Sequence, residues 1–204
     1  RSMVKLCSFF FRSAFIQHSF FILLRWYQTK GALFASLGGV FLFWAWGAAL
    51  TYLFFSLVFK ARVLFLPAVF SVLLFMLVVL FAGPKVRPLM PALQSNLMGI
   101  HVITYMVGYA AISLAFLISL IYLFSGRNNP QASPENAYLD DLAYQLTLFG
   151  FPFLTAGMII GSVWANIAWG SYWFWDPKET CSLITLLVYA LYLHLRLFKG
   201  WKGR

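Results

Sequence analysis

The chain has 204 residues, of which 62% are hydrophobic and only 10% are charged. Soluble domains usually carry about 25% charged residues, so this composition excludes a soluble globule and predicts an integral membrane protein. The net charge of +10 is of the kind that orients helices in a bilayer, and we infer no nucleic-acid binding from it. Cys7 and Cys181 form no CxxC pair, so a thiol redox motif is not expected.

Six apolar stretches are long enough to cross a bilayer, which takes about 20 residues. In chain order they are 3–24, 33–59, 62–82, 98–124, 142–165 and 177–198. The first is the weakest, because Lys5, Arg12 and His18 interrupt it. Arg12 and His18 also argue against a secretory signal. We expect an all-α, polytopic helical bundle with about six transmembrane helices.

The basic residues predict the orientation of these spans. Alternating the six spans places twice as many of the 15 basic residues on the side of the two termini as on the other side. This bias predicts that both termini are cytoplasmic. The connection 164–179 then faces the extracytoplasmic side.

Two further local patterns concern helix starts and helix packing. Ser133 before Pro134 predicts a helix start, and the prolines of 83–97 predict an extended loop. Gly157, Gly161 and Ala165 form a small-residue face, which predicts close packing against a neighbouring helix.

The connection 164–179, WANIAWGSYWFWDPKE, holds four of the eight tryptophans: Trp164, Trp169, Trp173 and Trp175. One explanation is an interfacial aromatic belt. The other is a platform for a large flat ligand such as haem, because stacking acts over the whole ring area. From the residues alone both stay open.

Charged residues near the tryptophans can be explained in two ways as well. Lys178, with Lys85 and Arg87 of the preceding outer loop, could bind propionate carboxylates, although each alone is more simply a solvated loop charge. Asp176 precedes Pro177, and Glu179 follows three residues after it, which is the pattern of a helix N-cap with a reciprocal glutamate.

Histidines within apolar spans are rare enough to suggest function. His101 begins the fourth span, on the side of the tryptophans. His194 lies 17 residues after Pro177, about 26 Å along a helix, so one iron cannot bind both. Snorkelling beside Arg196 is the simpler explanation of His194, and His18 is assigned no role.

Three segments resemble the CcsA (ResC) family of cytochrome c biogenesis proteins. The most specific is WGSYWFWDPKETCSLITLLVYALYLHLR, which is similar to the family's tryptophan-rich (WWD) signature. PALQSNLMGIHVITYMVGYA and LDDLAYQLTLFGFPFLTAGMIIGSVWA are similar to the segments before it. The resemblance divides the chain into N-terminal helices, 1–88, and a haem-handling core, 89–204.

The resemblance implies a function in cytochrome c assembly and a cofactor, haem b (iron protoporphyrin IX). It implies that His101 is an outer axial ligand to the iron, and that His194 is an inner ligand whose counterpart comes from a CcsB/ResB-type membrane partner. The haem platform would be Trp169, Trp173, Trp175 and Asp176, with Trp164 and Lys178 beside it. The family joins haem vinyl groups to the CxxCH thiols of apocytochrome c, in a bacterial cell membrane or a thylakoid.

This chain departs from the family pattern in three places. Asn96 and Cys181 stand where the family usually has Trp, and 30–40 lacks the polar pattern expected there. The family also has a further span with a second axial histidine, so we expect this chain to be C-terminally incomplete. Met98 or a histidine of the apocytochrome could supply that ligand instead.

Other functions stay open at this level. A transporter with a histidine relay would need acids within the spans, whereas the five acids are expected in connections or at helix starts. A haem-handling component of the CcmC or CcmF type is a further hypothesis, as is a scaffold whose aromatic loop anchors a partner. No side chain has the setting of a nucleophile or general base, so whether the chain is itself an enzyme is left undecided.

Overall fold

The computed structural model describes residues 2–29, 32–82, 93–125 and 134–202, and it divides the chain into two compact units, Arg1–Gln94 and Ser95–Arg204. We call them unit 1 and unit 2, and describe each by itself. The described residues form α-helices and short 3-10 turns. Six of the helices are long and apolar enough to cross a membrane, which confirms the all-α fold with six spans.

Unit 1 contains α1 (Ser2–Gln28), α2 (Leu37–Val58) and α3 (Phe65–Ala82). Ser36 caps α2, because its Oγ accepts a hydrogen bond from the N–H of Gly39 at 3.0 Å. The Nε1–H of Trp46 in α2 donates to Ser19 Oγ in α1 at 2.9 Å. Such hydrogen bonds between helices hold polar groups where lipid offers no partner.

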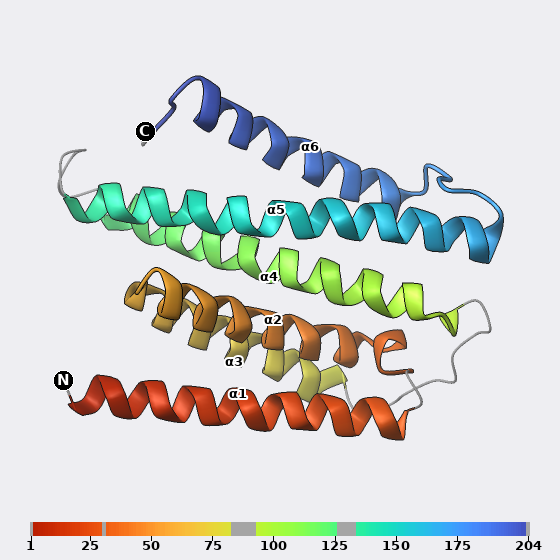
Figure 1. Cartoon of the computed structure of the whole chain (residues 1–204), viewed down its shortest axis with the longest axis horizontal. Helices are drawn as coiled ribbons and strands as arrows, with labels where there is room; N and C mark the ends of the chain where they lie inside the picture. The colour runs from red at the N-terminus through yellow and green to blue at the C-terminus, as the bar shows by residue number, and fades with distance from the viewer. Residues whose placement is uncertain (1, 30–31, 83–92, 126–133, 203–204) are drawn as a thin grey trace. The chain divides into compact units, whose positions relative to one another are not determined.

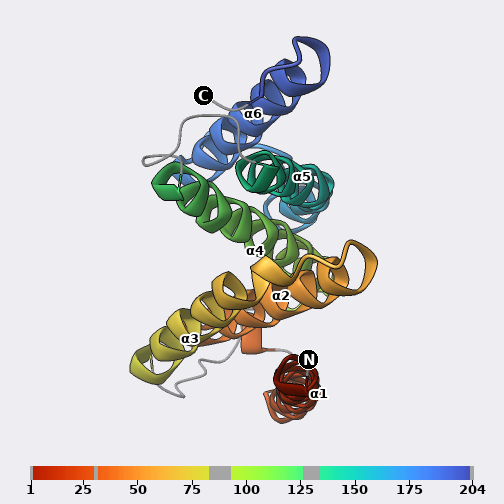
Figure 2. The ribbon, with the colours of Figure 1, turned by 90° about the vertical axis from the view of Figure 1, so that its left-hand side faces the viewer.

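Unit 2 contains α4 (Asn96–Ser125), α5 (Pro134–Trp169) and α6 (Pro177–Phe198). Figures 1 and 2 show α4 and α5 side by side over most of their length, with α6 following α5 back along the unit. Helix α4 therefore begins at the same end of the unit at which α5 ends and α6 begins. We call this the tryptophan end, and the end where α5 begins and α6 finishes the basic end.

Helix α5 is longer than its predicted span, 142–165, at both ends. It begins at Pro134, which confirms the predicted helix start there, although Ser133 lies outside the described residues. Asp140 and Asp141 are consequently inside the helix and not in a connection. At the other end α5 continues through Trp169, so Trp164 and Trp169 are helical. The expected tryptophan-rich connection, 164–179, is thus reduced to the loop 170–176.

Small residues allow α4 and α5 to approach closely. A Cβ on Gly108 of α4 would lie 2.7 Å from Leu154 Cδ2, and a Cβ on Gly150 of α5 would lie 3.0 Å from the carbonyl oxygen of Gly108. Leu154 is itself buried. The predicted small-residue face on α5 packs against the same helix, because a Cβ on Gly157 would meet Tyr105 and a Cβ on Gly161 would meet His101, both in α4.

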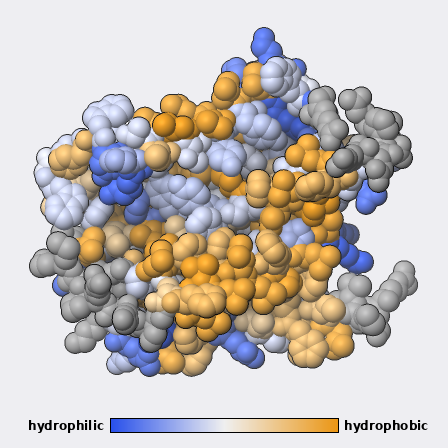
Figure 3. Space-filling model, turned by 180° about the vertical axis from the view of Figure 1, so that it is seen from behind, coloured by the Kyte–Doolittle hydropathy of each residue, from blue (hydrophilic) through white to orange (hydrophobic). Residues whose placement is uncertain are grey.

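The exterior of both units is strongly apolar, as a bilayer requires. Figure 3 shows hydrophobic side chains over much of the face that it draws. On α6 many apolar residues are exposed, and five of them follow one another at helical spacing: Ile184, Leu187, Val188, Leu191 and Phe198. Most of α6 is therefore free to contact lipid or another apolar helix.

Candidate functional site at the tryptophan end of unit 2

His101 lies in the second turn of α4, half-buried against α5. Its Nδ1 is 2.8 Å from the carbonyl oxygen of Gly157. A carbonyl only accepts, so the hydrogen of the neutral imidazole is on Nδ1, and Nε2 keeps a lone pair. Among the described residues no hydrogen bond to Nε2 is found. The geometry therefore presents Nε2 as a potential metal ligand.

Two indoles from the last turns of α5 lie beyond the imidazole of His101. The Trp164 ring is nearly parallel to that of His101, with an interplanar angle of 18° and centroids 6.5 Å apart. Trp169 meets Trp164 edge to face at 6.3 Å, and this residue is 52% exposed. The structure thus brings His101 and the first two tryptophans together at one end of one unit.

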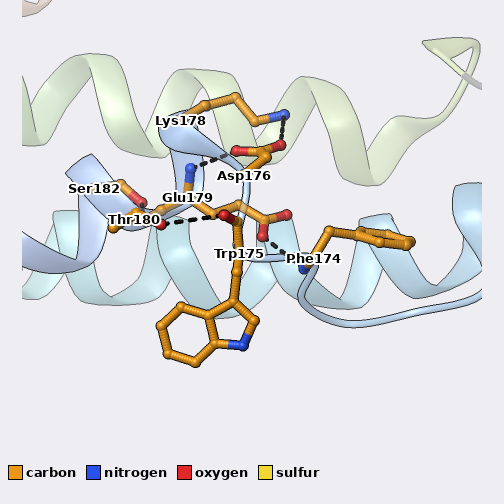
Figure 4. Close-up of polar contacts among 7 residues, drawn as sticks. All are labelled: Phe174, Trp175, Asp176, Lys178, Glu179, Thr180 and Ser182. Atoms are coloured by element: carbon orange, nitrogen blue, oxygen red, sulfur yellow. Dashed lines mark hydrogen bonds and ion pairs between the residues drawn. The ribbon is translucent and has the colours of Figure 1, made fainter.

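The loop 170–176 carries the other two tryptophans in an unusual backbone. Gly170 has φ +80°, and Trp175 has φ +59°, a left-handed conformation that costs a non-glycine residue about 1 kcal/mol. The Trp173 and Trp175 rings meet edge to face at 5.9 Å. Trp175 is 70% exposed, and Figure 4 shows its indole directed away from the helices.

Trp173 differs from Trp175 in the setting of its polar atom. Its Nε1–H is buried and finds no hydrogen-bond partner in the described parts of the chain. An indole N–H usually has a partner when buried. The loop therefore holds a donor that a bound carboxylate or carbonyl could satisfy.

The start of α6 is fixed by the predicted cap. Asp176 Oδ1 accepts from the N–H of Glu179 at 2.7 Å, and Pro177 occupies the first helical position. This hydrogen bond, with the nearby charge of Lys178, holds the pKa of Asp176 below its usual value. The predicted helix start is confirmed.

Glu179 is placed differently from its expected reciprocal role. Its Oε2 accepts from the N–H of Phe174 at 2.7 Å, where a simple capping box would bond the N–H of Asp176. As Figure 4 shows, Asp176 and Glu179 together tie both sides of Trp175 to the first turn of α6. Trp175, whose φ is positive, is therefore fixed by hydrogen bonds of both its neighbours, Phe174 and Asp176.

The cations near the tryptophans are only partly described. Lys178 Nζ lies 3.4 Å from Asp176 Oδ2, and its side chain is 79% exposed. It remains accessible to an anionic ligand, but a pair so exposed is weak. Lys85 and Arg87 lie outside the described residues.

His194 is at the basic end of unit 2 and does not join this site. Its exposed side chain contacts the ring of Phe198, with centroids 4.7 Å apart. Two residues later, Arg196 pairs with Asp140 of α5 at 2.6 Å, and only 8% of the Arg196 side chain is exposed. His194 therefore stays exposed, whereas Arg196, beside which it was expected to snorkel, turns inward to Asp140 of α5.

Sequence reasoning missed three elements of this arrangement. They are the carbonyl of Gly157, the Glu179 bond to Phe174 and the pairing of Asp140 with Arg196. The spacing of Gly157, Gly161 and Ala165 is the one sequence signal near the Gly157 carbonyl. That spacing predicts helix packing and not a hydrogen bond to His101. The described residues contain no group of three or more His, Cys, Asp or Glu that could hold a metal ion.

The sequence is similar to known proteins over most of its length. The profile of the family described as "Cytochrome C assembly protein" matches residues 10–204. "Cytochrome c biogenesis protein CcsA" of Chlamydomonas reinhardtii is 40% identical over 194 residues, covering 89% of this chain and 55% of that protein. The proteins of the same name from Porphyra purpurea and Synechococcus sp. (strain CC9605) are 33% and 36% identical, and each match covers 71% of the relative. This chain thus spans about half the length of the Chlamydomonas protein.

Proposed function

Because this chain belongs to the CcsA family of cytochrome c assembly proteins, we propose that it binds haem at the tryptophan end of unit 2 and presents it to an apocytochrome c. The observation that carries the proposal is the pairing of His101 with Gly157. It leaves Nε2 available beside the indoles of Trp164 and Trp169.

The residues present suit haem b in three respects. One imidazole supplies one axial ligand, which suits an iron whose four equatorial positions are filled by porphyrin nitrogens. Trp164, Trp169 and Trp175 offer apolar ring area for the conjugated skeleton. Lys178 is an exposed donor for a propionate carboxylate, and the buried Nε1–H of Trp173 would be a second one once haem binding moves the loop 170–176.

The reaction proposed for the cargo is the addition of two substrate thiols to two haem vinyl groups. Each S–H adds across one C=C bond, so that a C–S bond and a C–H bond form and no group leaves. The thiols belong to the CxxCH sequence of the apocytochrome. The chain contributes an iron ligand, orientation and exclusion of water, and none of its side chains has to act as a nucleophile.

A second haem position at the basic end is part of the proposal. His194 is exposed on the apolar face of α6, so its iron would need a second ligand from another helix, which we assign to a CcsB/ResB-type partner. Haem would enter here and leave at the tryptophan end. We place the protein in a bacterial cell membrane or a thylakoid. We place both termini on the cytoplasmic side, because the basic residues are in excess there.

The test compares histidine variants of the protein purified from its membrane. The His101→Ala variant is expected to lose most of the Soret absorbance of the tryptophan-end site and to stop maturation of a co-expressed CxxCH reporter. His194→Ala should stop maturation while a His101-dependent haem signal remains on protein supplied with haem. His18→Ala removes a histidine of unit 1 and should change neither measurement.

Two outcomes would contradict this function. An unchanged spectrum and normal maturation in the His101 variant would remove this imidazole from the site. Normal maturation after replacing Trp169, Trp173 and Trp175 by Phe would instead favour an aromatic anchor for a partner. A reporter whose two cysteines are replaced by serine should stay haem-free with the wild-type protein.

A further inference from the structure

Two successive turns of α5 lack side chains where two successive turns of α4 place aromatic rings. A Cβ on Gly157 would lie 2.6 Å from Tyr105 Cδ2. A Cβ on Gly161 would lie 2.5 Å from both Cε1 and Nδ1 of the His101 imidazole. Real Cβ contacts are not this short, so any residue other than glycine at 161 would have to displace the imidazole.

The space at Gly161 and the hydrogen bond to Gly157 are parts of one contact. In an α-helix the carbonyl of residue 157 faces the N–H of residue 161. The His101 ring therefore lies across one turn of α5, with its Nδ1–H directed at the carbonyl oxygen that begins that turn. A ring moved away from Gly161 would lose this hydrogen bond.

Trp164 limits the ring on a further side. It follows Gly161 by three residues, which is one turn, and its indole is tilted only 18° from the imidazole plane. Tyr105 meets the same imidazole edge to face at 4.9 Å. The imidazole is thus flanked by an aromatic ring on each of two sides, and a displaced ring would have to shift past them.

We propose that Gly161 is a positioning residue for the His101 imidazole: the missing side chain lets the ring lie where Gly157 fixes its tautomer and directs Nε2 toward a ligand. This rests on the proposed function only for the identity of that ligand as haem. A hydrogen bond from a ligating histidine to a carbonyl also raises the basicity of the ligand. Gly161 thus affects affinity and redox potential through His101, without contacting iron.

The first measurement needs no haem and no variant at residue 161. In haem-free wild-type protein labelled with ¹⁵N-histidine, the His101 signals should be those of the Nδ1–H tautomer. The signals are assigned by comparison with the His18→Ala and His194→Ala proteins. An Nε2–H tautomer for His101 near neutral pH would overturn the proposal.

The second measurement uses Gly161→Ala in the complete, haem-loaded protein. Loss of the hydrogen-bond partner of a ligating histidine typically weakens metal binding by about 10–100-fold, and we expect a loss of that order in haem affinity at the tryptophan end. The haem that still binds should have a higher midpoint potential, because the imidazole donates less electron density. In haem-free Gly161→Ala protein the Nδ1–H tautomer should no longer dominate.

Gly150→Ala is the matched control. It adds a methyl group to the same contact between α4 and α5, where the nearest atoms belong to Gly108, Ala111 and Ile112 and not to His101. It therefore controls for crowding of the two helices: the Nδ1–H tautomer of His101 should stay dominant, and haem affinity should fall less than in Gly161→Ala. If His101→Ala removes the haem signal but Gly161→Ala matches wild type, the positioning role is wrong and the proposed function stands. If His101→Ala changes nothing while the tautomer is as expected, the proposed function fails instead.

Discussion

The two histidines of unit 2 are supported in opposite ways. His101 is half-buried, hydrogen-bonded to a carbonyl of another helix and bordered by two aromatic rings. His194 is exposed, and the ring contact found for it among the described residues is with Phe198, on its own helix. One imidazole is preorganised by its own chain, whereas the other depends on whatever covers α6.

For the two ligand roles that we propose, this difference shows where each imidazole would gain its precision. The orientation of His101 is set by side-chain and backbone contacts within a few ångströms. The position of His194 is set by the placement of α6 as a whole. Near His194 that placement depends on the pair formed by Arg196 and Asp140, with Arg196 also 5.0 Å from the centre of the Tyr144 ring.

The largest effect should come from removing the charge of Asp140. The Asp140→Asn variant leaves the Arg196 guanidinium buried without its counterion, which we expect to destabilise unit 2 by about 3 kcal/mol. His194-dependent haem binding should be lost before His101-dependent binding. Thermal unfolding in detergent and the two Soret signals measure this.

Asp141→Asn is the matched control for that change. Asp141 is the neighbouring carboxylate, and it accepts a hydrogen bond from Gln145 on the exposed side of α5. The Asp141→Asn variant should leave both haem signals in place. Equal loss of the two signals in the Asp140 variant would break the comparison, because α6 would then position both histidines.

A smaller effect, confined to the tryptophan end, is expected from Glu179. Glu179→Ala removes the acceptor of the Phe174 N–H, a hydrogen bond that contributes about 1 kcal/mol, so haem affinity there should fall about fivefold. Glu179→Gln retains an oxygen acceptor and should stay close to wild type. Haem titration and limited proteolysis of the loop 170–176 measure both variants.

The result for Glu179→Gln shows whether the hydrogen bond or the charge of Glu179 causes the loss of haem affinity. Behaviour like that of the alanine variant would mean that the negative charge, and not the hydrogen bond to Phe174, is what matters. An effect of either variant on His194-dependent haem binding would contradict the separation of the two ends.

The smallest effect should be a pH dependence of the same loop. The pKa of Asp176 is lowered in the folded protein, so its carboxylate stabilises the fold fully above the ordinary aspartate pKa of about 3.9. This contribution is lost as the pH falls through the lowered pKa of the folded state. Hydrogen-exchange protection of the first turn of α6 should therefore stay constant from neutral pH and decrease only in acid.

Asp176→Asn tests the assignment of that pH dependence. Asparagine also caps helices but does not titrate in this range, so protection at the start of α6 should become independent of pH. A decrease in the variant as large as in wild type would assign the effect to another group.

Local patterns in the sequence predict local structure well. The six apolar stretches give the six helices, and the Asp176, Pro177, Glu179 pattern gives the start of α6. The predicted termini of α5 are wrong, because a polar first turn and an aromatic last turn can continue a helix beyond its apolar span. Trp164 and Trp169 are therefore in α5 and not in the loop.

The long-range contacts of the site could not be predicted from one sequence. His101 and Gly157 are 56 residues apart, as are Asp140 and Arg196. No periodicity links such residues, since their meeting depends on which helices pair and on their relative rotation. Gly161 gives a signal for close packing, but the identity of the ring against it requires coordinates.

The length of α5 has a consequence for access. Its 36 residues extend about 54 Å, whereas the hydrocarbon layer is about 30 Å thick. More than a third of this helix must therefore stand clear of the acyl chains or lean strongly across them. If most of the surplus lies beside Trp169, a water-soluble polypeptide can reach the indoles from the aqueous phase without entering lipid.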